Sequence, residues 1–304
     1  MNLSAITHHH SHASGAAALA RGKDELLSAL APHRAAGRMI GLVPTMGYLH
    51  EGHLSLLRAA RRECDVVVMS LFVNPAQFGE GEDLDRYPRD EQRDAKLAAE
   101  AGVDLVYAPP VEEVYPEGFA TTVEVSGLTD VLDGDAAQRG ASHFRGVATV
   151  VAKLFNTVQP HVAYFGQKDA QQLAVIRRMV RDLDIPVRIE GLPTVREEDG
   201  LAMSSRNAYL EPSDRERAAA ISRALDAAER RTRTTGALAA GIEAAQAELA
   251  AAGIEPEYVE ARDPEDLTPV AELNGRPVLL AVAARVGGAR LIDNVLIDPT
   301  TTET

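Results

Sequence analysis

The chain has 304 residues, of which 45% are hydrophobic and 25% charged, with a formal net charge of −14 at pH 7 and a single cysteine, Cys64. This length and composition fit an ordinary soluble protein of about two domains, and the single cysteine excludes an internal disulfide and a multi-cysteine zinc site. The net negative charge argues against a broad nucleic-acid-binding surface but leaves room for a local basic pocket for one anionic ligand. Because no apolar run approaches the roughly 18 residues of a membrane span and no secretory signal is evident, we expect a cytoplasmic enzyme without nucleic-acid or membrane partners.

The N-terminal residues 1–20 are rich in Ser, Gly and Ala, which predicts a loose extension. The histidine-rich run THHHSH at 7–12 could hold a metal, but no carboxylate or cysteine accompanies it, so we exclude it from the functional site. Leucines at helical spacing then predict a helix over 21–36.

The segment PTMGYLHEGH, residues 44–53, lies between an apolar run at 39–43 and an amphipathic helical pattern at 54–62. This order predicts a turn from a buried strand into a helix, where open α/β sheets bind nucleotides. His50 and His53 could bind a polyphosphate there and follow its charge during nucleotidyl transfer. Taken alone, two histidines on the first turn of a helix can also be inert.

A second buried strand is predicted over 65–73, followed by a loop at 74–78 in which Gln77 can face a crevice. The glycine-rich, charged segment 79–89 is compatible with a mobile lid and equally with an ordinary solvated loop.

A helix over 90–101 and a strand over 103–108 come next, and this alternation of strands and helices predicts a parallel, doubly wound sheet. A further strand is predicted over 121–125, before a loop at 127–142.

Residues 143–146, HFRG, lead into an apolar helical pattern that ends near Val158. Arg139 and Arg145 stand before or at the start of this helix, where cations could meet a ligand carboxylate or phosphate. Either arginine could equally be a solvated surface charge, so both are secondary candidates.

A strand over 161–165 ends in GQKD, residues 166–169, before another amphipathic helix. Lys168 could place its ammonium group on phosphate oxygens, whereas Asp169 could simply cap the helix. Two turns of this kind in one sheet strengthen the prediction of a nucleotide site.

A polar turn at 196–200 precedes LAMSSRN, in which two hydroxyl groups and a guanidinium could clasp a triphosphate, although Ser-Ser-Arg alone more often marks a loop or cap. From Pro212 the pattern predicts helices and then strands, and hence a smaller α+β domain. We place the domains at 1–194 and 195–304. The predicted helices span 212–232 and 236–252, and the predicted strands span 258–261, 278–284 and 290–296.

Together, PTMGYLHEGH, FVNPAQF, HFRGVATVVAKLFN, FGQKDAQQL, DGLAMSSRNAYL and ARLIDN resemble the pantothenate synthetase family of ATP-dependent pantoate–β-alanine ligases, over nearly the whole chain from about residue 20. The resemblance implies a Rossmann-like domain of the HxGH nucleotidyltransferase type, a smaller C-terminal α+β domain that closes over the site, and a homodimer. It also implies that pantoate and ATP give pantoyl adenylate and pyrophosphate, and that β-alanine then displaces AMP to form pantothenate.

The resemblance also implies residue roles. His53 would be the catalytic proton donor, His50 would contact the phosphates, and Lys168 would stabilise charge as pyrophosphate leaves. Gln77 would bind pantoate and β-alanine, and Gln172 would bind pantoate. The expected ATP-binding residues are Met46, Gly47, Tyr48, Leu49, His50, Glu51, Gly52, His53, Gly166, Gln167, Lys168, Asp169, Val195, Met203, Ser204, Ser205 and Arg206.

A magnesium ion is expected on the triphosphate, with Asp94 as a possible ligand, although Asp94 could also be a plain surface carboxylate of a helix. Gln167 stands where the family usually has glutamate, which leaves the role of residue 167 open. Because Gly166, Lys168 and Asp169 are present, we expect activity to persist.

Two other classes of protein share part of this pattern. Aminoacyl-tRNA synthetases use the HxGH logic but need an extended cationic surface, which a net charge of −14 does not suggest. A non-catalytic nucleotide-binding protein could have inherited the fold, and ATP binding without turnover would support that alternative.

Overall fold

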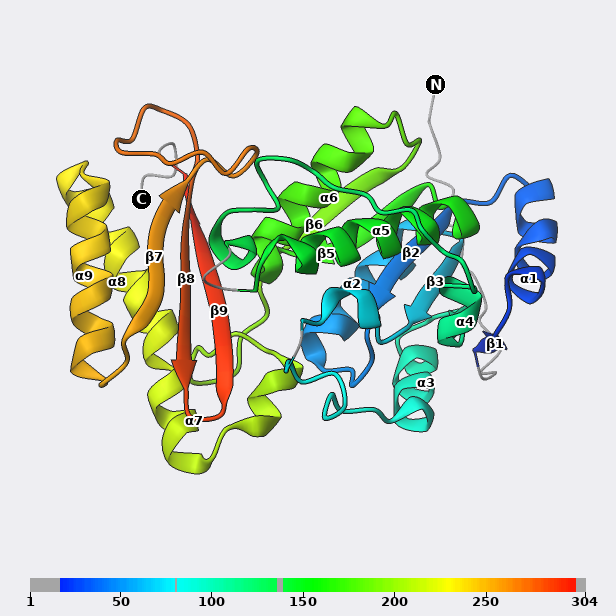
Figure 1. The fold of residues 1–304 in the computed structure, drawn as a ribbon, viewed down its shortest axis with the longest axis horizontal. Coiled ribbons are helices and arrows are strands. Elements are labelled where there is room, and N and C mark those ends of the chain that lie inside the picture. The colour runs from blue at the N-terminus through cyan, green and yellow to red at the C-terminus, as the bar shows by residue number, and fades with distance from the viewer. Residues whose placement is uncertain (1–16, 80, 136–138, 299–304) are drawn as a thin grey trace, which may run out of the picture.

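The structure, a computed structural model, describes residues 17–79, 81–135 and 139–298. Within these residues, six strands form a parallel sheet in the order β1-β4-β3-β2-β5-β6 (Figure 1). The chain passes from β2 to β3 and β4 on one side and returns to β5 on the other, so the strand order reverses between β2 and β5. The strands are β1 (Ala18–Ala20), β2 (Ile40–Thr45), β3 (Val66–Leu71), β4 (Leu105–Tyr107), β5 (Val162–Gly166) and β6 (Arg188–Leu192).

Helices cover both faces of this sheet. Successive strand residues point to opposite faces, so Leu42 packs in a cluster with α1, α5 and α6, whereas Val43 packs in a cluster with α2 and α3. Burial on both faces explains why these strands are almost continuously apolar. The helices are α1 (Lys23–Ala35), α2 (Glu51–Glu63), α3 (Glu91–Glu100), α4 (Val111–Val114), α5 (Ala141–Val158) and α6 (Ala170–Asp182).

The C-terminal part of the described chain forms a second, smaller unit, at the left of Figure 1. Its antiparallel sheet has the order β7-β8-β9, and its helices pack on that sheet around Leu225, Leu249 and Val282. The elements are α7 (Pro212–Ala218), α8 (Ala220–Thr235), α9 (Leu238–Ala251), β7 (Pro256–Arg262), β8 (Val278–Val286) and β9 (Ala289–Ile297).

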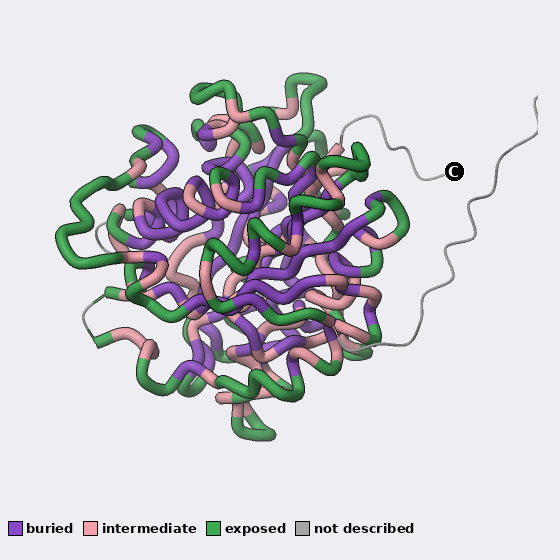
Figure 2. The backbone as a smooth tube through the Cα atoms, turned by 90° about the vertical axis from the view of Figure 1, so that its right-hand side faces the viewer, coloured by how far each residue is buried: buried purple, intermediate pink, exposed green. Residues whose placement is uncertain are grey.

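The predicted fold class, a doubly wound parallel sheet with a smaller C-terminal α+β unit, is confirmed. The domain boundary after residue 194 stays a prediction. Leu279 and Ala281 of β8 pack into the apolar cluster of the large sheet, so the two units share part of a core. Buried stretches run through the centre of the molecule, and exposed stretches gather at its periphery (Figure 2). None of the helices in the described ranges combines the length and hydrophobicity that crossing a bilayer requires.

Three local predictions are wrong. Residues 121–125 form no strand, because this segment lies against α5, where Thr149 Oγ1 accepts the N–H of Val123 at 2.9 Å. Residues 18–20, which are included in the predicted loose extension, form the strand β1, which pairs with β4. The single helix predicted over 212–232 is divided at Ala219 into α7 and α8. The histidine run at 7–12 lies outside the described residues.

Candidate active site

The candidate site lies at the switch point between β2 and β5, at the carboxyl ends of both strands. A cavity of about 230 Å³ there is lined by both histidines of the HxGH motif and by Gln77, Lys168 and Arg206. A second cavity, of about 360 Å³, lies between the large sheet and the C-terminal unit and shares Lys168 and Arg206 with the first. The site is therefore formed by both structural units.

Most of the predicted ligand-binding residues meet at the first cavity. Those that line it are Met46, His50, Gly52, His53, Gln77, Gly166, Lys168, Asp169, Gln172, Val195, Met203, Ser204, Ser205 and Arg206. The remaining candidates, Gly47, Tyr48, Leu49, Glu51, Gln167 and Asp94, do not line it.

Hydrogen bonds from the backbone fix the tautomer of both motif histidines. His50, the N-cap of α2, accepts the N–H of Gly52 at Nδ1 (3.2 Å), and His53 accepts the N–H of His50 at Nδ1 (3.3 Å). A ring nitrogen that accepts a hydrogen bond carries no hydrogen, so each neutral ring has its N–H at Nε2. With ring centroids 4.1 Å apart, the two imidazoles form a pair of Nε2–H donors.

Both motif histidines are neutral at pH 7. Burial, followed by the positive charge of Lys168, lowers the pKa of His50 to about 4. Burial, followed by the proximity of His50 and Lys168, lowers the pKa of His53 to about 3. Gly52 permits this packing, since a Cβ atom at residue 52 would lie 2.9 Å from the His50 ring.

The turn before these histidines is held by Asp94 of α3. Asp94 is only 1% exposed, and its two carboxylate oxygens accept the N–H groups of Tyr48 (2.6 Å) and Leu49 (2.8 Å). The expectation that Asp94 could be a surface carboxylate is therefore wrong, and its oxygens are already engaged by the backbone rather than directed at the nucleotide cavity. In the described ranges, no group of three His, Cys, Asp or Glu residues could hold a metal ion.

Gln77 belongs to the 3₁₀ helix η1 (Pro75–Gln77) at the end of β3 and is buried. Its Oε1 accepts from Asn74 Nδ2 at 3.0 Å, which directs its Nε2 toward Met46 Sδ, 3.1 Å away. Asn74 is itself held by the Gly146 carbonyl of α5, at 3.1 Å. Because a thioether sulfur is a weak acceptor, the Gln77 Nε2–H group can exchange Met46 Sδ for a stronger acceptor, such as a substrate hydroxyl or carboxylate oxygen.

Lys168 lies in the 3₁₀ helix η3 (Gln167–Asp169) after β5, and β9 holds this turn from the other structural unit. Asn294 Nδ2 donates to the carbonyl oxygens of Gln167 and Lys168, both at 2.9 Å. The Gln167 side chain reaches Asn294 Oδ1 at 3.5 Å, so residue 167 faces β9 rather than the nucleotide cavity. The neighbouring Asp293 anchors Arg196 at 2.6 Å.

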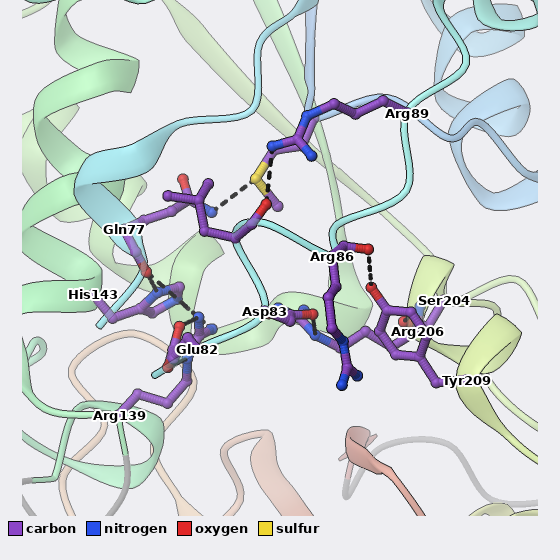
Figure 3. A network of polar contacts seen from close by, with 12 residues as sticks. Gln77, Glu82, Asp83, Arg86, Arg89, Arg139, His143, Ser204, Arg206 and Tyr209 are labelled. Atoms are coloured by element: carbon purple, nitrogen blue, oxygen red, sulfur yellow. Dashed lines mark hydrogen bonds and ion pairs between the residues drawn. The ribbon is translucent and has the colours of Figure 1, made fainter. Parts of the chain in front are cut away.

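Two arginines of the site are paired with carboxylates of segment 79–89 (Figure 3). Arg206, in the 3₁₀ helix η4 (Ser205–Tyr209), contacts Asp83 at 3.0 Å, and Arg139 contacts Glu82 at 2.7 Å. Of the two secondary candidates, Arg139 thus lies in the site. Arg145 is a half-exposed surface charge 3.6 Å from Glu124.

His143 is a site residue that the sequence alone did not reveal. Its Nδ1–H donates to the Gln77 carbonyl (2.7 Å), and its Nε2 accepts from Arg139 (3.0 Å) (Figure 3). The same holds for Asn294, because neither HFRG nor ARLIDN has a local sequence pattern that shows which of its side chains reaches the site.

The chain is similar to known proteins over most of its length. A sequence model of the family described as pantoate-beta-alanine ligase matches residues 18–296. The chain is 54% identical to the pantothenate synthetase of Sinorhizobium medicae (strain WSM419), over 90% of this chain and 94% of that protein. It is 56% identical to the pantothenate synthetase of Moorella thermoacetica, over 88% and 94% of the two chains.

Solved structures give the same result. The crystal structure of pantothenate synthetase from Thermus thermophilus superimposes with a TM-score of 0.87 at 51% identity, covering 93% of this chain and 100% of that one. A pantoate-beta-alanine ligase from Francisella tularensis, crystallised with beta-gamma ATP and beta-alanine, gives a TM-score of 0.76 at 33% identity, covering 92% and 98%.

Proposed function

Since the chain belongs to the pantoate–β-alanine ligase family and is therefore a ligase, we propose that it joins its two substrates in two ATP-driven steps. In the first, a carboxylate oxygen of pantoate attacks the α-phosphorus of ATP and pyrophosphate leaves, which gives pantoyl adenylate. In the second, the amine of β-alanine attacks the acyl carbon, loses a proton and displaces AMP, which gives pantothenate. Adenylation is needed because a free carboxylate is a poor acyl donor.

The observation that carries the proposal is the pair of Nε2–H donors, His50 and His53, beside Lys168 at the switch point of the sheet. Fixed donors stabilise charge that develops on phosphate oxygens without having to reorganise during the reaction. Lys168, from the facing turn, adds a full positive charge to the same cavity.

We propose that the Nε2–H of His53 acts on the charge that develops on the leaving pyrophosphate, either as a hydrogen bond or, as the resemblance implies, by transfer of the proton. Burial lowers the pKa of His53 to about 3, so its ring is neutral at pH 7 before phosphates bind. Bound phosphates would raise the pKa of both histidines, because negative charge favours the protonated ring.

The Gln77 and Gln172 amides are the proposed contacts for pantoate, with Gln77 also near the β-alanine position; both line the nucleotide cavity. Magnesium, when bound, would neutralise phosphate charge. Because Mg²⁺ is usually held through substrate phosphates with few protein ligands, such an ion would need no cluster of protein carboxylates. Homodimer formation, which rests on the family resemblance, and a cytoplasmic location, which rests on the sequence pattern, both stay predictions.

Pyrophosphate exchange tests the proposal. The purified protein is incubated with ATP, magnesium, labelled pyrophosphate and pantoate, without β-alanine, and label entering ATP is measured. Amino acids with tRNA replace pantoate in parallel reactions. Exchange that requires pantoate is the expected result. ATP binding without exchange for any acid would overturn the proposal and favour a non-catalytic nucleotide-binding protein.

A further inference from the structure

Helix α3 contacts the HxGH turn from the side opposite the nucleotide cavity. The buried Asp94 carboxylate accepts two consecutive backbone N–H groups, those of Tyr48 and Leu49. Asp94 and Gly47 line a separate cavity of about 270 Å³, which contains neither motif histidine. Asp94 therefore acts on the back of the turn.

The backbone of this turn needs such a contact. Gly47 and Tyr48 have φ angles of +87° and +52°, in the left-handed region, and this conformation is strained for a residue with a bulky side chain such as Tyr. Consecutive N–H groups that converge in this way form a concave site for an anion. The Asp94 carboxylate packs closely against the backbone of Gly47, because a Cβ atom at residue 47 would lie only 2.9 Å from Asp94 Oδ2.

Arg93, the preceding residue of α3, contacts the same turn through a backbone carbonyl group. Its guanidinium donates to the Leu49 carbonyl at 3.0 Å and lies 5.4 Å from the centre of the Tyr48 ring. The Arg93 and Asp94 side chains are 3.5 Å apart. Helix α3 thus accepts two N–H groups of the turn through Asp94 and donates to one of its carbonyl groups through Arg93.

We infer that Asp94, with Arg93, is a positioning residue for the motif histidines and not a magnesium ligand. Leu49 directly precedes His50, whose N–H fixes the tautomer of His53. A shift of the turn therefore moves the hydrogen bonds that place both Nε2–H donors. Displacements of about 1 Å in such a site can cost about 10²-fold in rate.

The test compares Asp94→Asn with a matched control, Asp104→Asn. Asp104 also accepts a backbone N–H, that of Val67 (2.7 Å), in the same sheet unit but outside the site. Since the inference rests on the proposed function, both variants are measured by pyrophosphate exchange over a range of magnesium concentrations and by ¹⁵N NMR of the histidine side chains. Denaturant unfolding reports their stability.

Asp94→Asn is expected to lower kcat for exchange about 10²-fold, with the pantoate KM unchanged and the deficit equal at every magnesium concentration. Its NMR spectrum should lose the pure Nε2–H signature of His50 and His53. Asp104→Asn should lose stability but keep kcat and the NMR signature. Recovery of Asp94→Asn at high magnesium would establish a metal ligand and overturn the inference, as would a wild-type kcat with wild-type histidine signals.

Arg93→Gln gives a second test should Asp94→Asn fail to fold, because the Arg93 side chain is 46% exposed. It should show the same loss of kcat and of histidine order, in weaker form, and unchanged histidine signals with unchanged kcat would contradict the inference. If wild-type protein shows no exchange, the proposed function fails, whereas the NMR comparison still decides whether α3 positions the histidines.

Discussion

The two sides of the nucleotide cavity are held in different ways. On the side of the large sheet, His50 and His53 are fixed by hydrogen bonds from the backbone. Around the rest of the cavity, Arg206 and Arg139 are held by carboxylates of segment 79–89 (Figure 3). In the proposed function, phosphates would meet the histidines as they stand, but they would have to replace carboxylates at the two arginines. The difference separates preorganised groups from exchangeable ones.

Histidine tautomers follow the same division. His50 and His53 accept at Nδ1 and donate at Nε2, whereas His143 donates at Nδ1 to the Gln77 carbonyl and accepts at Nε2 from Arg139. The first pair can donate to a ligand. His143 has both ring nitrogens engaged within the protein, so it supports Gln77 and Arg139 instead.

Removing a preorganised donor should have the largest effect. We expect His53→Ala to lower kcat for pantoate-dependent exchange about 10²–10³-fold, since a fixed donor to the developing charge is lost. His33→Ala, at a histidine of α1 outside the site, is the control and should keep wild-type kcat. A folded His53→Ala protein with near-normal exchange would remove His53 from the reaction.

Removing an exchangeable cation should act mainly on binding. Arg206→Ala is expected to raise the KM for ATP about 10- to 100-fold, because a charge-assisted hydrogen bond contributes about 1.5–3 kcal/mol. The half-exposed Arg145 is the matched control, and Arg145→Ala should leave KM unchanged. A fall in kcat with an unchanged KM would show that Arg206 belongs with the preorganised groups.

Those parts of the site that depend on local sequence could be predicted. The turns at 44–53 and 166–169 follow apolar runs and carry glycine and charged residues, so periodicity and composition identify them. The hydrogen bonds from Asn294 to Gln167 and Lys168 join residues more than 120 positions apart, and no local pattern encodes such a contact.

The errors have physical causes too. The sequence pattern of α3 makes Asp94 resemble a surface residue of an amphipathic helix. It does not show that the N–H groups of Tyr48 and Leu49, on a distant turn, need the Asp94 carboxylate as their acceptor. Residues 121–125 have strand propensity, but propensity describes a side chain's fit to a sheet and not whether a partner strand is available.

Acid should destabilise the protein through all three buried histidines around the cavity, His50, His53 and His143, and His143 can be tested separately because it lies outside the proposed donor pair. Burial lowers the pKa of His143 to about 4, below its ordinary value of 6.5, so the unfolded chain binds more protons between these values. The stabilisation is complete above pH 6.5 and is lost as pH falls toward 4, at up to ~1.4 kcal/mol per pH unit. His143→Gln should remove this part of the slope, measured by urea unfolding at pH 7, 6 and 5; an unchanged slope would contradict the assignment.

The smallest effect is expected from releasing an exchangeable cation. Asp83→Asn removes the carboxylate that competes with phosphate for Arg206, in a pair whose side chains are 19% and 26% exposed. Because ion pairs of this exposure contribute up to about 1 kcal/mol, the KM for ATP should fall about two- to fivefold. Asp85→Asn, at an exposed carboxylate of the same segment, is the control for net charge. An equal fall in both variants would indicate a general charge effect, and a rise in Asp83→Asn would mean that the ion pair holds Arg206 ready for ATP and is not exchanged.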